Sequence, residues 1–291
     1  MRINTNVASL NAQEAATNTQ KNLGSSLEKL SSGLRINKAS DDASGLAIAD
    51  KLRTQASSIG QSISNGNSAV SLTQIADKAM GEQSNILDII KQKLIQGATA
   101  TTSQEGRNAI GKDINKLLTQ LDAIATQTNY NGIQLLQQSA TGNDSAAAQV
   151  FQMGEKSADT VTLASGITAN SHGLNGMSAL KTATGATFTS GTSTTITGAT
   201  MRADMINIDS ALNQLNSWRS EVGSTQNQLE SGLRNMMTQH TNIKAAESVI
   251  RDVDYAQESA NFNKQNIIAQ AGTYAMSQSN AIQQNVLRLL Q

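Results

Sequence analysis

An apolar residue recurs at every seventh position over a long stretch toward the C-terminal end of the sequence, and no other pattern constrains the fold as strongly. The series runs without a gap through Ile208, Leu215, Val222, Leu229, Met236, Ile243 and Ile250. A fixed seven-residue repeat on a helix makes an apolar seam that must be buried against another helix. The sequence therefore predicts a long helix over about residues 201–250, and a helical partner for it.

The composition favours long interlocking helices over a compact globular core. Aromatic residues make up 2% of the 291 residues, so the core must be built from aliphatic side chains, Met and Ala. Proline is absent, and no helix is therefore kinked or stopped by a proline ring. Both features permit unusually long helices.

Charge and residue usage argue against several functional classes. The formal net charge is +0, which offers no basic field for a nucleic acid or an anionic membrane. Cysteine is absent and the two histidines, His172 and His240, are far apart, so we expect no metal site, no cofactor and no enzymatic activity. The polar N-terminal segment predicts neither a cleavable secretory signal nor a membrane span, and secretion would need a signal-independent route.

Helical periodicity extends to both ends of the chain. Further helices are predicted over about residues 2–34, 44–98, 103–128 and 258–290. Residues 36–43 are rich in turn formers, and Ser40, Asp41 or Asp42 is expected to cap the helix that follows. The 44–98 and 201–250 segments have similar lengths, which suggests that they lie side by side.

The middle of the chain differs from both ends. Residues 149–153 and 160–164 alternate in polarity across a turn-like bridge, which predicts a β-hairpin. Residues 182–200 are nearly all small and polar, and would form either a loose loop or a second short hairpin. The predicted fold is mainly α, a long α-helical coiled-coil bundle from both termini with a small β-hairpin region in the middle.

The apolar stripes of the two outermost helices are incomplete. Leu10, Leu23, Leu27, Leu30 and Leu34 mark the first of these helices, and Ile268, Ile282, Val286 and Leu289 mark the last. Gln, Asn and Ser fill the intervening positions. We expect these helices to fold on association with each other and with neighbouring copies of the chain.

Several blocks of the sequence resemble bacterial flagellins, in particular those of epsilon-class proteobacteria. The block from Leu27 to Asn37 and the block from Ala39 to Ala49 are similar to the most characteristic segment of that family. The remaining blocks are Met1 to Asn11, Thr128 to Gly132 and Asn285 to Leu290. The resemblance covers about residues 1–165 and 200–291.

The resemblance implies a structural subunit that polymerises helically into the extracellular flagellar filament used for swimming. Residues 1–43 with 255–291 would form inner-tube helices, and residues 44–165 with 200–254 a surrounding shell bundle with the β-hairpin. Residues 166–199 would be a short variable insert exposed at the surface. Implied partners are other copies of the chain, a flagellar type III export chaperone, and the hook-associated and cap proteins. The expected inner-tube assembly residues are Leu10, Leu23, Leu27, Leu30, Leu34, Ile268, Ile282, Val286, Leu287, Leu289 and Leu290.

Two further expectations follow from the resemblance. Many flagellins carry an Arg, a Leu and a Glu that Toll-like receptor 5 reads, and the matching positions here are Ile89, Lys93 and Asp113, so weak or absent receptor activation is expected. Solvent-facing hydroxyls in this group are often O-glycosylated, and the candidates here are Ser190, Thr192, Ser193, Thr194 and Thr195.

Three alternatives remain open at this stage. A hook–filament junction protein shares the terminal helices but matches the Leu27–Ala49 block less closely. A coiled-coil signalling protein, such as a chemoreceptor hairpin, would have similar Ala/Ser/Gln-rich heptads but also membrane spans. For an enzyme, the Asp41–Asp42 carboxylate pair is better explained as a helix cap and loop.

Overall fold

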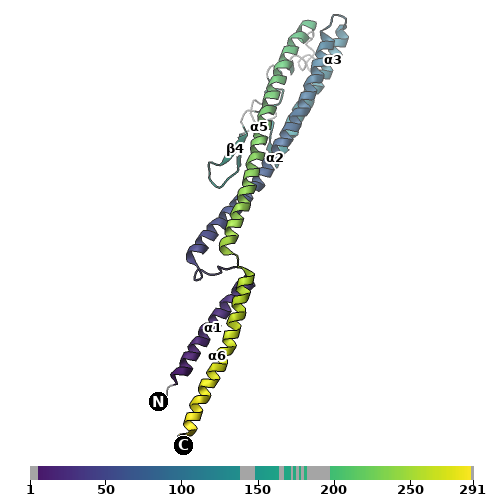
Figure 1. Ribbon diagram of the computed structural model, residues 1–291. Helices are drawn as coiled ribbons and strands as arrows, with labels where there is room; N and C mark the ends of the chain where they lie inside the picture. Colours follow the sequence, from purple (N-terminus) through teal and green to yellow (C-terminus); the bar gives the residue numbers. More distant parts are fainter. Residues whose placement is uncertain are drawn as a thin grey trace. The chain divides into compact units, whose positions relative to one another are not determined.

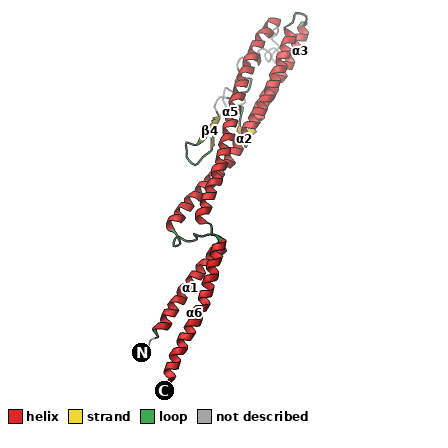
Figure 2. Ribbon diagram, viewed as in Figure 1, coloured by secondary structure: helices red, strands yellow, loops and turns green. Residues whose placement is uncertain are grey.

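Long helices account for most of the structure. The computed structural model describes residues 6–137, 148–163, 167–171, 173–174, 177, 180–181 and 197–289. The helices are α1 (Val7–Ser32), α2 (Ala43–Ala98), α3 (Gln104–Gln127), α5 (Gly198–Arg251) and α6 (Tyr255–Leu289), drawn in Figures 1 and 2. The prediction of a mainly α-helical chain is confirmed, and the helix ends lie within a few residues of those expected.

Two small antiparallel strand pairs interrupt the helices. β1 (Asn129–Tyr130) pairs with β2 (Ile133–Gln134) across a turn formed by Asn131 and Gly132, both of which have positive φ. β3 (Gln149–Gln152) pairs with β4 (Thr160–Leu163), with Gln149 opposite Leu163. The second pair is the β-hairpin that the alternating segments predict.

The chain divides into two compact units. Met1–Ser57 and His240–Gln291 form the first, which we call the terminal unit, and Ser58–Gln239 form the second, the central unit. The helices α2 and α5 each have residues in both units. None of the described helices has the length and hydropathy that a bilayer-spanning segment requires.

Within the central unit, α2 and α5 run antiparallel along each other (Figure 1). An ion pair joins Asp77 to Arg219 at 3.1 Å, and a second joins Lys91 to Asp209 further along. At the far end the Arg202 side chain donates to the carbonyl oxygen of Ala98 at 3.3 Å. The predicted partnership between these two helices is therefore confirmed.

The heptad series of α5 forms the core of the central unit. Ile208, Leu215, Val222 and Leu229 are fully buried and Met236 nearly so. Ile208, Leu215 and Val222 belong to one buried cluster with residues of α2 and α3, among them Leu87, Leu94 and Leu118. Burying one such side chain contributes about 1.5–3 kcal/mol, so this seam supplies much of the free energy that folds the unit. Trp218 is partly buried against the same core.

The expectation of a surface-exposed insert over residues 166–199 is wrong for the part of that range that the structure describes up to Lys181. The apolar members of this part are buried in the core of the central unit: Ile167, Ala169, Leu174, Met177 and Leu180. The Asp122 carboxylate on α3 accepts hydrogen bonds from the backbone N–H and hydroxyl of Ser171 and pairs with Lys181. These five buried apolar side chains hold the described part of this Ser/Thr/Gly-rich segment against the core of the central unit.

The start of α2 is fixed by one of the three predicted caps. Asp42 Oδ1 accepts from the backbone N–H of Gly45 at 2.9 Å, while Asp41 Oδ2 accepts from the N–H groups of Asn37 and Lys38. These hydrogen bonds hold the pKa of each carboxyl below its ordinary value. The Asp41–Asp42 pair therefore shapes the loop and caps the helix.

Candidate self-assembly surface

In the terminal unit, α1 and α6 pack as an antiparallel pair. Tyr255 donates from its hydroxyl to the carbonyl oxygen of Leu30 at 3.1 Å, and the Ser26 hydroxyl donates to the Glu258 carboxylate. At the other end Asn6 donates to the carbonyl oxygen of Ser279. The two helices therefore contact each other near both ends of the pair.

The seam between α1 and α6 is made mostly of small and polar side chains. On each helix a series of partly or fully buried positions follows alternating spacings of three and four, as in a coiled coil; Glu28 and Lys29 of α1 are partly buried outside this series. These positions are Ser9, Ala12, Ala16, Thr19, Leu23, Ser26 and Leu30 on α1, and Glu258, Phe262, Gln265, Ala269, Gly272, Met276 and Ser279 on α6. Such a seam buries little apolar surface for its length.

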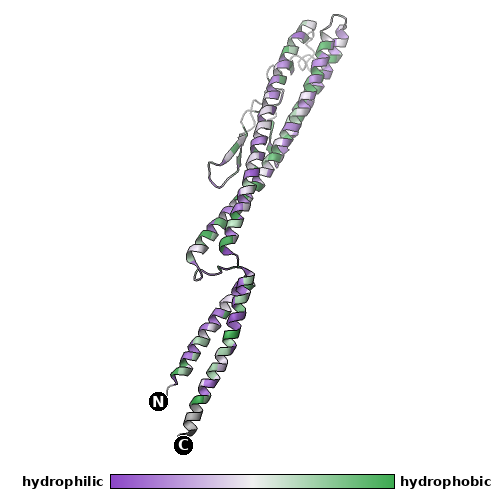
Figure 3. Cartoon of the chain, viewed as in Figure 1, coloured by the Kyte–Doolittle hydropathy of each residue, from purple (hydrophilic) through white to green (hydrophobic). Residues whose placement is uncertain are grey.

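Large apolar side chains of the same two helices face outward instead. Leu10 is 54% exposed, Leu27 56%, Ile268 41% and Ile282 55%. Figure 3 shows apolar residues along both helices of the pair. Leu23 and Leu30, by contrast, lie on the seam, so the structure separates the predicted assembly residues into an internal and an external set.

Other predicted assembly residues have different placements. Leu34 is half-buried and forms an antiparallel bridge with Asp252, where the α1–α2 linker crosses the α5–α6 linker. The side chains of Val286, Leu287, Leu289 and Leu290 lie outside the described residues.

The predicted assembly residues omit four outward-facing apolar residues of the terminal pair. Val7, Tyr255, Ile267 and Tyr274 are each more exposed than Leu10. Ile267 directly precedes Ile268, so a count of apolar residues on both flanks of the seam, rather than on one stripe, would have found it.

The shell-seam residues divide between the two units. Ile208 to Met236 lie in the central unit, whereas Ile243 and Ile250 lie in the terminal unit and are half-buried. His240, at the unit boundary, is half-buried as well. The seam thus continues beyond the central core but with weaker burial.

The three positions compared with receptor-read residues lie on the surface of α2 and α3. Ile89 is 42% exposed. The Lys93 ammonium lies 3.1 Å from the Asp113 carboxylate, which links the two helices by an exposed ion pair. The Lys93 ammonium is thus held toward α3.

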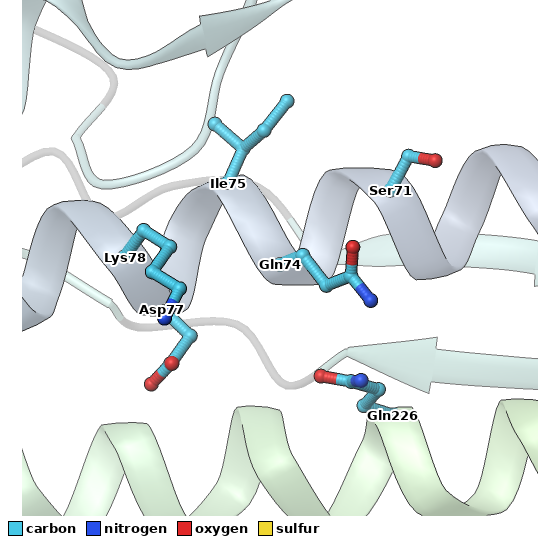
Figure 4. Close-up of a pocket in the computed structure, with 6 residues that line it drawn as sticks. All are labelled: Ser71, Gln74, Ile75, Asp77, Lys78 and Gln226. Carbon is cyan, nitrogen blue, oxygen red and sulfur yellow. The ribbon is translucent and has the colours of Figure 1, made fainter.

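A surface hollow lies along α2 in the central unit (Figure 4). Its lining residues are Ser71, Gln74, Ile75, Asp77 and Lys78 of α2 with Gln226 of α5. Asp77 is already paired with Arg219, and Gln226 donates to Glu230 at 3.0 Å. Within the described ranges no group of three His, Asp or Glu side chains could hold a metal ion. The hollow carries no catalytic constellation.

One carboxyl group lies on the buried side of α5. Asp204 is half-buried, four residues before Ile208, and burial raises its pKa above the ordinary value, an effect that the hydrogen bond from Asn207 partly offsets. The candidate glycosylation residues Ser190, Thr192, Ser193, Thr194 and Thr195 lie outside the described residues.

Comparison with known proteins matches both ends of the chain to one family. The model of the bacterial flagellin N-terminal helical region matches residues 3–141, and that of the C-terminal helical region matches residues 205–290. A flagellin from Bacillus subtilis is 33% identical, with all of both chains covered. Flagellin A from Helicobacter pylori is 29% identical across 99% of both chains, in an alignment of 506 positions that implies a long extra segment in that relative.

A solved structure supports the fold. A protein described as flagellar hook-associated, from Vibrio parahaemolyticus, superposes with a TM-score of 0.59 over 72% of this chain and 99% of its own, at 13% sequence identity. The full-length match to the Bacillus relative and the two family models agree with the helical unit that the structure shows. The chain therefore belongs to the bacterial flagellin family, whose members are structural subunits of the flagellar filament.

Proposed function

We propose that the α1–α6 pair forms the inner tube of a filament, and that its outward-facing apolar residues bind neighbouring copies of the chain. The observation that supports this is the division of the pair into a small, polar internal seam and an apolar exterior. Large apolar side chains exposed on a helix surface favour association with another protein surface. Because a heterologous interface need not close into a ring, the same contact can propagate as an open helix.

A pair of charge substitutions on α6 tests this proposal. Ile268→Lys places a charge on the outward surface, whereas Gln270→Lys places the same charge at an exposed polar position two residues away. We expect polymerising salt to give no filaments from the first variant and normal filaments from the second, with equal helical content in both monomers. Normal filaments from Ile268→Lys would contradict the inner-tube assignment.

The remaining family-derived roles belong to the same proposal. Residues 1–43 with 255–291 would be the inner tube, and residues 44–165 with 200–254 the shell. The chain would leave the cell through the flagellar type III channel with an export chaperone and meet the hook-associated and cap proteins at the filament ends. Its role is mechanical, with no catalytic step.

Weak or absent activation of Toll-like receptor 5 is also proposed. Ile89 offers no cation, and the Lys93 charge is held by Asp113. The double variant Ile89→Arg with Lys93→Leu should raise the response of a receptor reporter cell line, while Ile95→Arg, at another exposed position of α2, should not. A strong response to the unaltered chain would refute this part.

Glycosylation of the hydroxyls at Ser190, Thr192, Ser193, Thr194 and Thr195 is proposed from the family resemblance alone. The intact mass of filament protein from the native cell tests it against the sequence mass of 30.6 kDa. A mass equal to the sequence mass would exclude the modification.

A further inference from the structure

The turn end of the β3–β4 hairpin is held in a notch between two glycines of different helices. A methyl group placed on Gly66 of α2 would lie 3.1 Å from Cε of Met153, and one placed on Gly232 of α5 would lie 3.4 Å from the same atom. Met153 directly follows β3, and its backbone N–H donates to the carbonyl oxygen of Asp159 at 2.9 Å. The thioether methyl therefore fills a space that exists because both helix positions lack a side chain.

The hairpin has separate anchors at its two ends. At the open end, Leu163 is buried in the core of the central unit. Phe151, two residues before Met153, is partly buried against the same core. Val150, on the opposite face of β3, is 59% exposed. Because side chains alternate along a strand, Met153 points to the same face as Phe151 and extends the docked surface to the turn.

The Met153 side chain contacts the helices and is also partly accessible to solvent. Its side chain is half-buried, whereas Met80 and Met177 are fully buried in the core. Met237 of α5 is 49% exposed. A thioether that solvent reaches can be oxidised, and the effect on structure depends on what the side chain holds in place.

We propose that Met153 is a redox-sensitive anchor, a modification site at which a hydroperoxide releases the turn end of the hairpin. Hydrogen peroxide transfers one oxygen atom to Sδ as its O–O bond breaks; the sulfur is oxidised to the sulfoxide, and the peroxide is reduced to water. The sulfoxide is larger, chiral and polar. Cε of Met153 lies beside the two glycine positions, and Cδ1 of Leu233 would lie 2.9 Å from a methyl group on Gly66. Oxidation places a polar oxygen on Sδ, one bond away from this apolar contact, and so weakens the anchor.

Hydrogen–deuterium exchange of the full chain, before and after treatment with hydrogen peroxide, tests this proposal, with the oxidised methionines located by mass spectrometry. In the unaltered chain, peroxide should speed exchange at the Met153 amide by about tenfold and leave α3 unchanged. Met153→Leu should abolish the peroxide response. Met237→Leu should retain it, since it removes an exposed methionine of α5 and leaves Met153 in place. Met153→Gln, which is polar without oxidation, should speed exchange in untreated protein.

Three results would overturn the proposal. Full oxidation of Met153 with no change in hairpin exchange would show that the side chain is not an anchor. An undiminished peroxide response in Met153→Leu would assign the effect to another methionine. Slow exchange in untreated Met153→Gln would show that the notch tolerates a polar group.

Discussion

At the residue scale, the start of α2 shows how a short polar motif sets a helix boundary. Asp42 caps the helix through Gly45, and a methyl group on Gly45 would lie 2.4 Å from Asp42 Oδ2 and 2.8 Å from Cδ1 of Ile36. A side chain at position 45 would therefore force the Asp42 carboxylate and the Ile36 side chain to shift. The motif predicts the boundary, but the sequence does not distinguish Asp42 from Ser40 or Asp41 as the cap.

Replacement of Asp42 tests the cap. Asp42→Asn keeps a side-chain acceptor for the Gly45 N–H, whereas Asp42→Ala removes it, so unfolding should occur at lower urea concentration in the alanine variant than in the asparagine variant. The pKa of Asp42 is lowered in the folded chain, so its ionic contribution is present above the ordinary carboxyl pKa and is lost as pH falls through the folded value. Equal stability of both variants at neutral pH would show that the cap is unimportant.

Asp204 makes the free energy of unfolding depend on pH in the opposite direction to Asp42. Its pKa is raised from the ordinary 3.8 by burial, so the folded chain binds the proton to higher pH than the unfolded chain. The free energy of unfolding therefore decreases as pH rises from about 3.8 through the folded pKa. Asp204→Asn removes the buried charge and should stabilise the chain at neutral pH, with the gain shrinking as pH is lowered. A gain that is constant with pH in urea titrations would contradict this account.

At the element scale, the helices were predictable, but packing surfaces made of small residues were not. The heptad of α5 was found because its residues are large and apolar. On α2, the large apolar residues Ile63 and Val70 are only half-buried. The buried positions of the same stretch are Ser62, Gly66, Ala69, Leu72 and Thr73, most of them small. Small side chains let two helices approach closely, and a search for large apolar residues cannot detect them.

The glycines of the central unit test this close approach. A methyl group on Gly66 would lie 2.9 Å from Cδ1 of Leu233, whereas one on Gly223 of α5 would have no neighbour within 4 Å. Gly223→Ala should stabilise the chain by about 1 kcal/mol through helix propensity. Gly66→Ala gains the same propensity but loses roughly 1–3 kcal/mol to overpacking, so no net gain is expected. Equal stabilisation in urea unfolding would mean that α2 and α5 do not approach closely.

At the scale of the whole molecule, the residues that form the core are distinct from those that we propose for assembly. The core seam of α5 is buried in the single chain, while Leu10, Leu27, Ile268 and Ile282 are exposed in it. The family followed from sequence blocks at both termini. The internal seam of the α1–α6 pair did not, because it is built from Ala, Ser and Thr and resembles a solvent-facing surface.

This separation predicts two classes of variant. Leu215→Ala deletes a fully buried side chain and should lower the free energy of unfolding by about 2–5 kcal/mol. Leu10→Ala changes an exposed side chain and should alter monomer stability by no more than about 0.5 kcal/mol while slowing polymerisation. Urea unfolding and sedimentation in polymerising salt measure the two effects, and a Leu10→Ala variant that polymerises at the normal rate would contradict the division.

The central claim is that the outward-facing side chains of the α1–α6 pair hold the filament together. Cryo-electron microscopy of filaments grown from the purified chain tests it most directly. The account predicts a tube with a central channel, formed by α1 and α6, in which Leu10, Leu27, Ile268 and Ile282 are buried against neighbouring copies. Filaments in which these four side chains remain exposed, or purified protein that forms no tube at all, would contradict it.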